Sequence, residues 1–208
     1  MNSVGAASDE SAPPEPSRRQ ITRERLVDLA AAAFVNEGFA NVSVRDLAAR
    51  TNMTSGAIYG NFAGKSDLLL EVIDSRIHQQ LEVFPRAGAD HLADVLAEMY
   101  ESYPDRAEMR ALLLEGAVAA RGDSEVRQRL HDGQIASLDR WAGAYDDLQE
   151  QGDIAADLDA QGVLRLLWAL ELGLGVLEAL DLDLPDPAQA ARIVGRMVAG
   201  LAVTDGTS

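Results

Sequence analysis

The feature that most constrains the fold is residues 43–67, where two very short helices are predicted directly before a long one. Ser43 and Asp46 have the spacing of a capping box, and Thr54 is predicted to cap the second short helix. Both helix starts also have the spacing of a hydrophobic staple, Val42 with Leu47 and Met53 with Ile58. Helices this short are marginal alone, so caps and packing against longer helices must hold them. The pattern predicts a helix-turn-helix.

The rest of the chain is also predicted to be helical. Apolar residues make up 47% of the sequence but aromatic residues only 5%, which favours helices packed through Ala and Leu over sheets. No strand pattern and no internal repeat is present. We predict an all-α fold of about nine helices, at 22–37, 43–50, 54–61, 65–81, 90–103, 105–121, 124–151, 159–180 and 186–203. The first three make an N-terminal headpiece, and the others make a C-terminal bundle.

The ends of the chain differ in composition from its middle. The first stretch holds three prolines among Ser, Ala and Glu, and it cannot bury enough apolar surface to fold. It also lacks the apolar core of a signal peptide, so we expect a cytoplasmic location. The predicted division is a disordered tail at 1–17, a headpiece at 18–66, a bundle at 67–203 and a disordered end at 204–208.

The longest apolar run, residues 163–180, could be mistaken for a membrane span. It contains Arg165, Glu171 and Glu178, and an arginine at the centre of a membrane helix costs about 2.5–3.5 kcal/mol. We therefore predict a helix buried between subunits and no membrane partner.

Charge is divided unevenly along the chain. Residues 17–66 carry seven basic and four acidic side chains, a net +3, whereas the remainder carries eleven basic and thirty acidic ones, a net −19. The total of −16 therefore hides a mildly basic headpiece on an acidic body. Phosphate would repel the body and attract the headpiece, so the headpiece is the segment expected to meet DNA.

Enzyme classes find little support in the sequence. Cysteine is absent, which excludes thiolate zinc sites and cysteine nucleophiles. His78, His91 and His131 are too widely spaced for a helical metal site, and neither a GxSxG motif nor a phosphate loop is present. We predict no catalytic residues, no metal and no cofactor. A helical protein-interaction module that uses the helix-turn-helix as a scaffold remains the rival to a DNA-binding protein.

The region from residue 21 to residue 72 has a distinctive order and spacing of residues, carried by Gly38, Phe39, Val44, Asp46, Leu47, Ala48, Gly56, Ile58, Tyr59, Phe62, Lys65 and Leu68. In these residues the region resembles the TetR family of transcriptional regulators. The resemblance implies a DNA-binding headpiece, a ligand cavity among the middle helices, and a dimer built from the last two helices. Two departures concern Gly60 with Asn61, where a bulky or basic residue followed by histidine is common, and Gly64, where serine is common. The first puts base preference in doubt.

The second short helix is the expected recognition helix, with its N-terminal end in the major groove. Tyr59 and Lys65 are expected at phosphates, although Tyr59 could instead be a core aromatic, and the arginines of 18–19 could form a flexible arm. The predicted DNA contacts are Arg18, Arg19, Thr22, Ser43, Val44, Arg45, Thr54, Ser55, Gly56, Ala57, Tyr59, Asn61 and Lys65. Arg50 is expected in a salt bridge or in solvent.

The body is expected to dimerise and to bind an effector, so the chain is predicted to be a homodimeric repressor that a small molecule releases from a palindromic operator. The dimer candidates are Leu166, Leu170, Gly173, Leu177, Ala191, Val194, Gly195 and Val198. The effector candidates are Met99, Met109, Leu113, Glu115, Trp141, Tyr145, Trp168 and Glu171. Packing within one chain is the alternative for both sets. Glu115 and Glu171 suggest a cationic or hydrogen-bonding effector, or pairing with arginines such as Arg165. An activator, or a regulator without an effector, is the alternative function.

Overall fold

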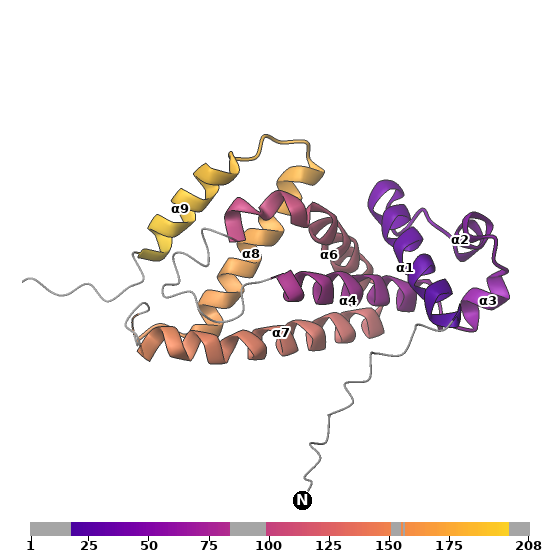
Figure 1. The fold of residues 1–208 in the computed structure, drawn as a ribbon, viewed down its shortest axis with the longest axis horizontal. Helices are drawn as coiled ribbons and strands as arrows, with labels where there is room; N and C mark the ends of the chain where they lie inside the picture. The colour runs from indigo at the N-terminus through magenta and orange to yellow at the C-terminus, as the bar shows by residue number, and fades with distance from the viewer. Residues whose placement is uncertain (1–17, 84–98, 151–154, 156, 200–208) are drawn as a thin grey trace, which may run out of the picture.

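A computed structural model describes residues 18–83, 99–150, 155 and 157–199, and within these ranges every regular element is a helix. The elements are α1 (Arg18–Glu37), α2 (Val44–Thr51), α3 (Ser55–Tyr59), α4 (Lys65–Val83), the 3-10 helix η1 (Tyr103–Arg106), α6 (Ala107–Ala120), α7 (Ser124–Glu150), α8 (Ala160–Ala179) and α9 (Pro187–Ala199). The predicted all-α class is confirmed. Figure 1 shows α1, α2 and α3 at one end of the molecule, α9 toward the other, and α4 and α6 between them.

Two helix starts differ from the prediction. Helix α1 begins at Arg18, about one turn before the predicted cap Thr22. Neither glycine nor proline interrupts this segment, and Gln20 Nε2 donates to Glu24 Oε1, an i,i+4 bond that supports the added turn. Helix α6 begins at Ala107, because Pro104 lies in the 3-10 turn before it. The predicted tails and residues 90–98 and 200–203 lie outside the described residues.

One apolar core joins the headpiece to the body. Its large members include Leu26 and Phe34 of α1, Leu47 of α2, Ile58 of α3, Leu68, Leu69, Val72 and Ile73 of α4, and Leu112 of α6. The predicted boundary after residue 66 therefore falls at the start of α4, whose apolar face belongs to the same core as the helix-turn-helix. Leu29 of α1 is 40% exposed, because α1 turns Val27 and Ala31 inward.

Charged side chains reinforce this junction. Arg76 of α4 donates through Nη2 to Asp28 Oδ1 on α1 at 3.0 Å and through Nε to Glu108 Oε1 on α6 at 2.7 Å. At the start of α4, Asp67 accepts the backbone N–H of Ala63 at 2.9 Å. Asp67 thereby fixes the turn that leads into α4, much as the acidic residue of a capping box does.

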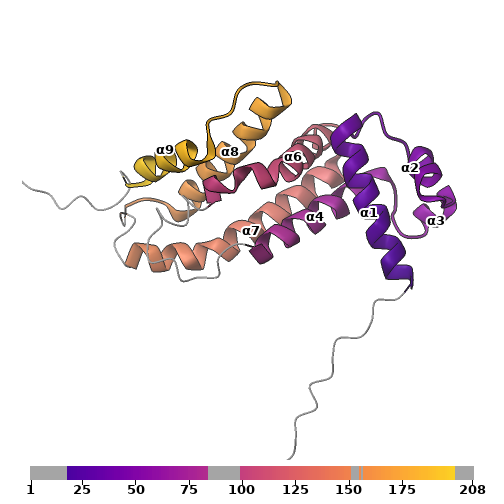
Figure 2. The same ribbon diagram turned by 45° about the horizontal axis from the view of Figure 1, so that its top comes forward.

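A second core lies where η1, α8 and α9 meet. It contains Tyr100, Tyr103, Leu174, Ala190, Ala191 and Val194. Helix α9 lies beside α8 in both ribbon views (Figures 1 and 2). The Tyr103 hydroxyl donates to the carbonyl oxygen of Pro185 at 2.7 Å, which holds the α8–α9 loop. None of the described helices has the length and apolar character needed to cross a membrane.

Candidate nucleic-acid interface

Local capping fixes both short helices of the headpiece, as predicted. Ser43 Oγ accepts the backbone N–H of Asp46, while the Asp46 carboxylate accepts the backbone N–H of Ser43 at 3.0 Å. The hydrogen bonds from Ser43 hold the pKa of Asp46 below its usual value. Thr54 Oγ1 accepts the N–H of Ala57 at 3.1 Å, and Asn52 adopts the left-handed conformation that ends α2. The turn between the two helices is therefore set by neighbouring residues.

The outward surface of α3 is small and polar. Gly56 and Ala57 are exposed, Ser55 is half-buried, and Tyr59 is 57% exposed, so Tyr59 is not a core aromatic. Asn61 Nδ2 donates to the carbonyl oxygen of Ala57 at 2.8 Å, which holds its amide against the helix. These side chains form a surface that can approach the edges of bases in a major groove.

The structure corrects one predicted DNA contact. Val44 is buried in the first core, so its side chain cannot reach DNA. The apolar face of α2 needs this residue, because Val44, Leu47 and Ala48 are the buried residues that fix α2 to the headpiece.

Two arginines of the headpiece, Arg50 and Arg23, form ion pairs with carboxylates, and a third, Arg45, is exposed. Arg50 forms a bidentate pair with Glu37, with one bond of 2.8 Å, and this confirms the expected salt bridge. Arg23 pairs with Glu71 of α4. Arg45 is exposed on α2. The backbone at Arg18 and Arg19 is helical, where a flexible arm was the alternative, and their side chains lie outside the described residues.

Lys65, the one lysine of the chain, makes its contacts inside the protein. Its Nζ donates to the carbonyl oxygen of Phe39 at 2.7 Å and to that of Ala40 at 3.4 Å, and it lies 4.3 Å from the centre of the Phe39 ring. Burial lowers the pKa of this ammonium group. The predicted phosphate contact of Lys65 stays a prediction, and in the structure the same group ties α4 to the α1–α2 turn.

The segment that contains this helix-turn-helix matches a known protein family. A family model described as bacterial regulatory proteins, tetR family, matches residues 26–72, from α1 into α4. This chain is a TetR-family transcriptional regulator. The match covers the same residues on which the resemblance in the sequence rests.

Relatives of this TetR-family regulator extend the match over most of its length. The transcriptional regulator UidR of Escherichia coli K12 is 27% identical over 186 residues, which cover 88% of this chain and 93% of UidR. The structure of Salmonella enterica GusR has a TM-score of 0.76 at 23% identity and covers 91% of this chain and 99% of that one. The SmeT–triclosan complex has a TM-score of 0.67 at 25% identity, with 90% and 94% covered. UidR is named as a transcriptional regulator, and this chain is not an enzyme.

The body of the TetR-family regulator contains a buried ion-pair cluster. Glu171 of α8 accepts Arg106 Nε at 3.0 Å and Arg110 Nη1 at 2.8 Å. Arg110 also donates through Nε to Glu178 at 2.8 Å and through Nη1 to the carbonyl oxygen of Tyr103 at 2.7 Å. Two guanidinium groups thus face two carboxylates, which leaves the cluster neutral. Sequence spacing could not find these partners, because they pair α6 and η1 with α8.

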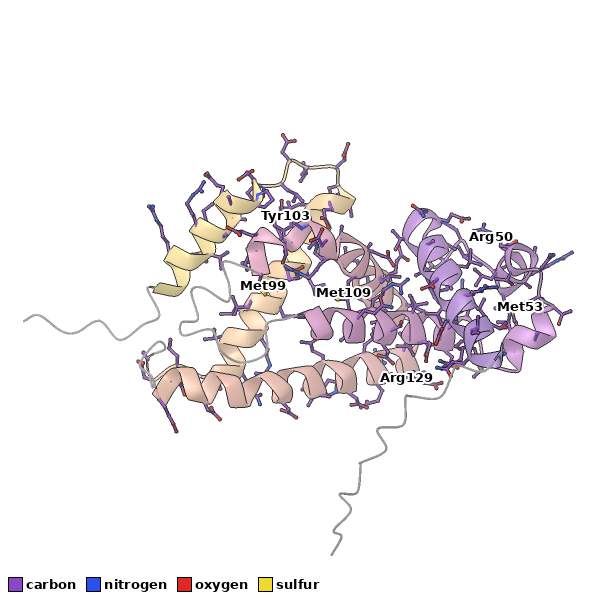
Figure 3. The ribbon with its side chains drawn as sticks, in the orientation of Figure 1. Arg50, Met53, Met99, Tyr103, Met109 and Arg129 are labelled. Carbon is purple, nitrogen blue, oxygen red and sulfur yellow. The ribbon has the colours of Figure 1, made fainter. Side chains whose placement is uncertain are left out.

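This cluster changes the interpretation of the effector candidates. Glu171 is satisfied by Arg106 and Arg110, not by Arg165, which donates to Gln161 on its own helix. The structure therefore gives Glu171 no free charge for a cationic effector. Figure 3 shows Met99, Tyr103 and Met109 on the η1–α6 side of the molecule, away from Arg50 and Met53 of the headpiece.

The other effector candidates are not gathered at one place. Leu113 packs against the first core, and Glu115 accepts the backbone N–H of Phe39 at the headpiece. Trp168 is partly exposed on α8, while Met99 packs against the second core. The side chains of Trp141 and Tyr145 lie outside the described residues. The structure thus corrects the predicted role of Leu113 and Glu115 as effector contacts, because α6 turns both side chains toward the headpiece.

Tyr100 is a residue that sequence reasoning missed. Its hydroxyl is buried and has no hydrogen-bond partner among the described residues. Burial, followed by the nearby carboxylate of Glu171, raises the pKa of Tyr100 to about 12. A buried hydroxyl without a partner is costly, so it marks a place where a water or a ligand atom would be bound favourably.

Two tyrosine variants compare the Tyr100 hydroxyl, which has no partner among the described residues, with the Tyr103 hydroxyl, which is hydrogen-bonded to Pro185. Removing the unpaired hydroxyl with Tyr100→Phe should leave the free energy of unfolding unchanged or raise it. Tyr103→Phe breaks the bond to Pro185 and should lower it by about 0.5–1.5 kcal/mol. Urea unfolding at one protein concentration measures both variants. A loss for Tyr100→Phe as large as that for Tyr103→Phe would show that the Tyr100 hydroxyl is bonded in solution.

The outer face of α8 and α9 is apolar and open. Leu166 is 73% exposed, and Leu170, Gly173 and Leu180 follow it at helical spacing along α8. A Cβ placed on Gly173 would meet nothing within 4 Å, whereas one on Gly175 would lie 3.0 Å from Cβ of Arg110. Gly175, which could have admitted a partner helix, therefore admits α6 of the same chain.

The dimer candidates on α9 do not all face outward. Ala191 and Val194 were dimer candidates but are buried in the second core of the same chain. Ile193 and Met197 are exposed instead, because burying Ala190, Ala191 and Val194 turns the opposite side of the helix outward. Leu177 and Gly195 are half-buried, and the side chain of Val198 lies outside the described residues.

Proposed function

We propose that this regulator is a homodimeric repressor that binds a palindromic operator through α2 and α3 and is released by a small-molecule effector. The observation that carries the proposal is the capped helix-turn-helix whose exposed Gly56, Ala57 and Tyr59 leave room for a DNA groove. Such a protein acts where the chromosome is, so we place it in the cytoplasm.

The DNA-binding face is tested by the salt dependence of binding. DNA selected from a random pool supplies the operator, and Arg45→Ala should reduce the slope of log K against log[salt] by about 1.8, because each of the two protomers loses one phosphate contact. Arg50→Ala is the matched control, because Arg50 pairs with Glu37, and its slope should equal that of the wild type. Equal slopes for wild type and Arg45→Ala would remove Arg45 from the interface. Transcription in vitro from the selected site should fall on adding protein, and a rise would favour an activator.

The dimer is supported by the apolar stripe on α8 and by the exposed Ile193 and Met197 of α9. A charge placed on this stripe would be buried in the dimer, so Leu166→Glu should convert the dimer to monomer at micromolar concentration. Val118→Glu is the matched control, because Val118 is 66% exposed on α6 and lies outside the stripe. Sedimentation measures both, and a wild type that sediments as a monomer would refute the dimer.

The effector is proposed to be an uncharged molecule with a hydrogen-bond acceptor for the Tyr100 hydroxyl. The ion-pair cluster beside Tyr100 is already neutral, so it offers no charge to an ionic ligand. The SmeT–triclosan complex has a similar fold, which supports a small-molecule effector. Uncharged compounds should raise the melting temperature of the wild type more than that of Tyr100→Phe. Equal shifts in both proteins would contradict the role of Tyr100.

A further inference from the structure

The turn between α1 and α2 is held from two sides by charged side chains. The backbone N–H of Phe39 donates to Glu115 Oε2 on α6 at 2.8 Å. The carbonyl oxygen of the same residue accepts Lys65 Nζ on α4 at 2.7 Å. Both backbone polar groups of Phe39 are thus bound by ionised side chains, and such bonds are stronger than those between neutral groups.

The turn is shaped to receive these contacts. Gly38 has a φ of 83°, a conformation that strains other residues, and a Cβ at Gly38 would lie 3.7 Å from Glu115 Oε1. The rings of Phe39 and Phe34 pack edge to face, with 5.3 Å between ring centres, and Lys65 Nζ lies over the Phe39 ring at 4.3 Å from its centre. Backbone and side chain of Phe39 are therefore both fixed.

The same helix that holds Phe39 is fixed to α8 at its other end. Arg110 of α6 is fully buried and pairs with Glu171 and Glu178 of α8. Glu115 lies on α6 between Leu112, which packs into the headpiece core, and Gly116. A Cβ on Gly116 would lie 2.9 Å from Ile73 Cδ1, so α6 also fits closely against α4. A continuous set of contacts therefore joins the outer helix α8 to the turn that leads into α2.

We propose that Glu115 and Lys65 are positioning residues that set the angle at which α2 and α3 meet DNA, and so determine the spacing between half-sites. The inference rests on the proposed dimeric function. Two half-sites move apart by about 3.4 Å for each added base pair, so a dimer with fixed headpieces accepts one spacing. Without the two bonds to Phe39, the headpiece can tilt and accept neighbouring spacings.

The experiment measures affinity for the selected operator and for operators one base pair shorter and longer. The proteins are full-length wild type, Glu115→Ala, Glu115→Gln, Lys65→Met and the control Glu150→Ala. Glu150 is exposed at the end of α7, and its removal changes the net charge as Glu115→Ala does. All are compared at a temperature at which circular dichroism shows each to be folded.

We expect the wild type and Glu150→Ala to bind the operator of selected spacing about tenfold more tightly than the shorter and longer operators. For Glu115→Ala and Lys65→Met this preference should fall to about threefold or less. Both values lie within the range of measured couplings between sites. Glu115→Gln keeps an acceptor for the Phe39 N–H and should keep most of the preference. The salt slope of Lys65→Met should equal that of the wild type, because the proposed role of Lys65 is not a phosphate contact.

Three results would overturn the inference. An unchanged spacing preference in Glu115→Ala would show that the Phe39 bond does not set the headpiece angle. A salt slope lower by about 1.8 in Lys65→Met, one phosphate contact for each protomer, with its spacing preference unchanged, would make Lys65 a phosphate contact. If the wild type enriches no DNA, the proposed function fails together with the inference, whereas the first two results leave that function intact.

Discussion

Replacing Arg110 with alanine is expected to lower the free energy of unfolding by about 3–5 kcal/mol. The Arg110 side chain has no exposed surface and donates to Glu171, Glu178 and the carbonyl oxygen of Tyr103. Its removal leaves Glu178 without this partner and Glu171 with Arg106 alone, so the cluster keeps one uncompensated negative charge. Urea unfolding at fixed protein concentration measures the change, because the concentration of a dimer affects its stability.

Arg165→Ala is the matched control for this prediction. Arg165 is exposed on α8 and donates to Gln161 of the same helix, so its loss should change stability by no more than about 0.5 kcal/mol. A loss below about 1 kcal/mol for Arg110→Ala would mean that water enters the cluster and screens its charges.

The second large effect is expected at Leu47, where Leu47→Ala should lower the free energy of unfolding by about 2–5 kcal/mol. Leu47 is fully buried and is the largest apolar residue that α2 contributes to the first core. The cavity left behind would loosen α2 and the turn before α3, so DNA binding should weaken as well. Hydrogen exchange of the Met53 amide, which donates to the carbonyl oxygen of Ala48, reports this loosening directly.

Leu29→Ala provides the comparison for the same chemical change. Leu29 is 40% exposed on α1, so its truncation should cost less than about 1 kcal/mol and leave the exchange of Met53 unchanged. Equal losses for the two variants would contradict the view that α2 depends on Leu47 for its packing.

The local structure of the headpiece followed from the sequence because its causes lie within a few residues of one another. The capping box of Ser43 and Asp46 and the cap at Thr54 each join residues three positions apart. Gly38, which directly follows the predicted helix 22–37, ends α1 in the left-handed conformation. The same local patterns carried the family resemblance, and the family model matches the same region.

Contacts between distant helices could not be predicted in this way. The rotation of α6 turns Glu115 toward Phe39 and Arg110 toward Glu171, and that rotation is the outcome of packing along the whole helix. The sequence offered Arg165 as a partner for Glu171 only because it lies nearby in the chain. The pairing of Arg110 with α8 depends instead on where α6 crosses α8, at Gly175.

The helices, their caps and the helix-turn-helix could be predicted from the residue order, because periodicity and capping act over one or two turns. The packing of the folded chain sets which face of α9 is open, which glycine admits a neighbouring helix, and the contact of Lys65 with Phe39. Each of these depends on the relative rotation and crossing of helices, which is set by the fit of many side chains at once.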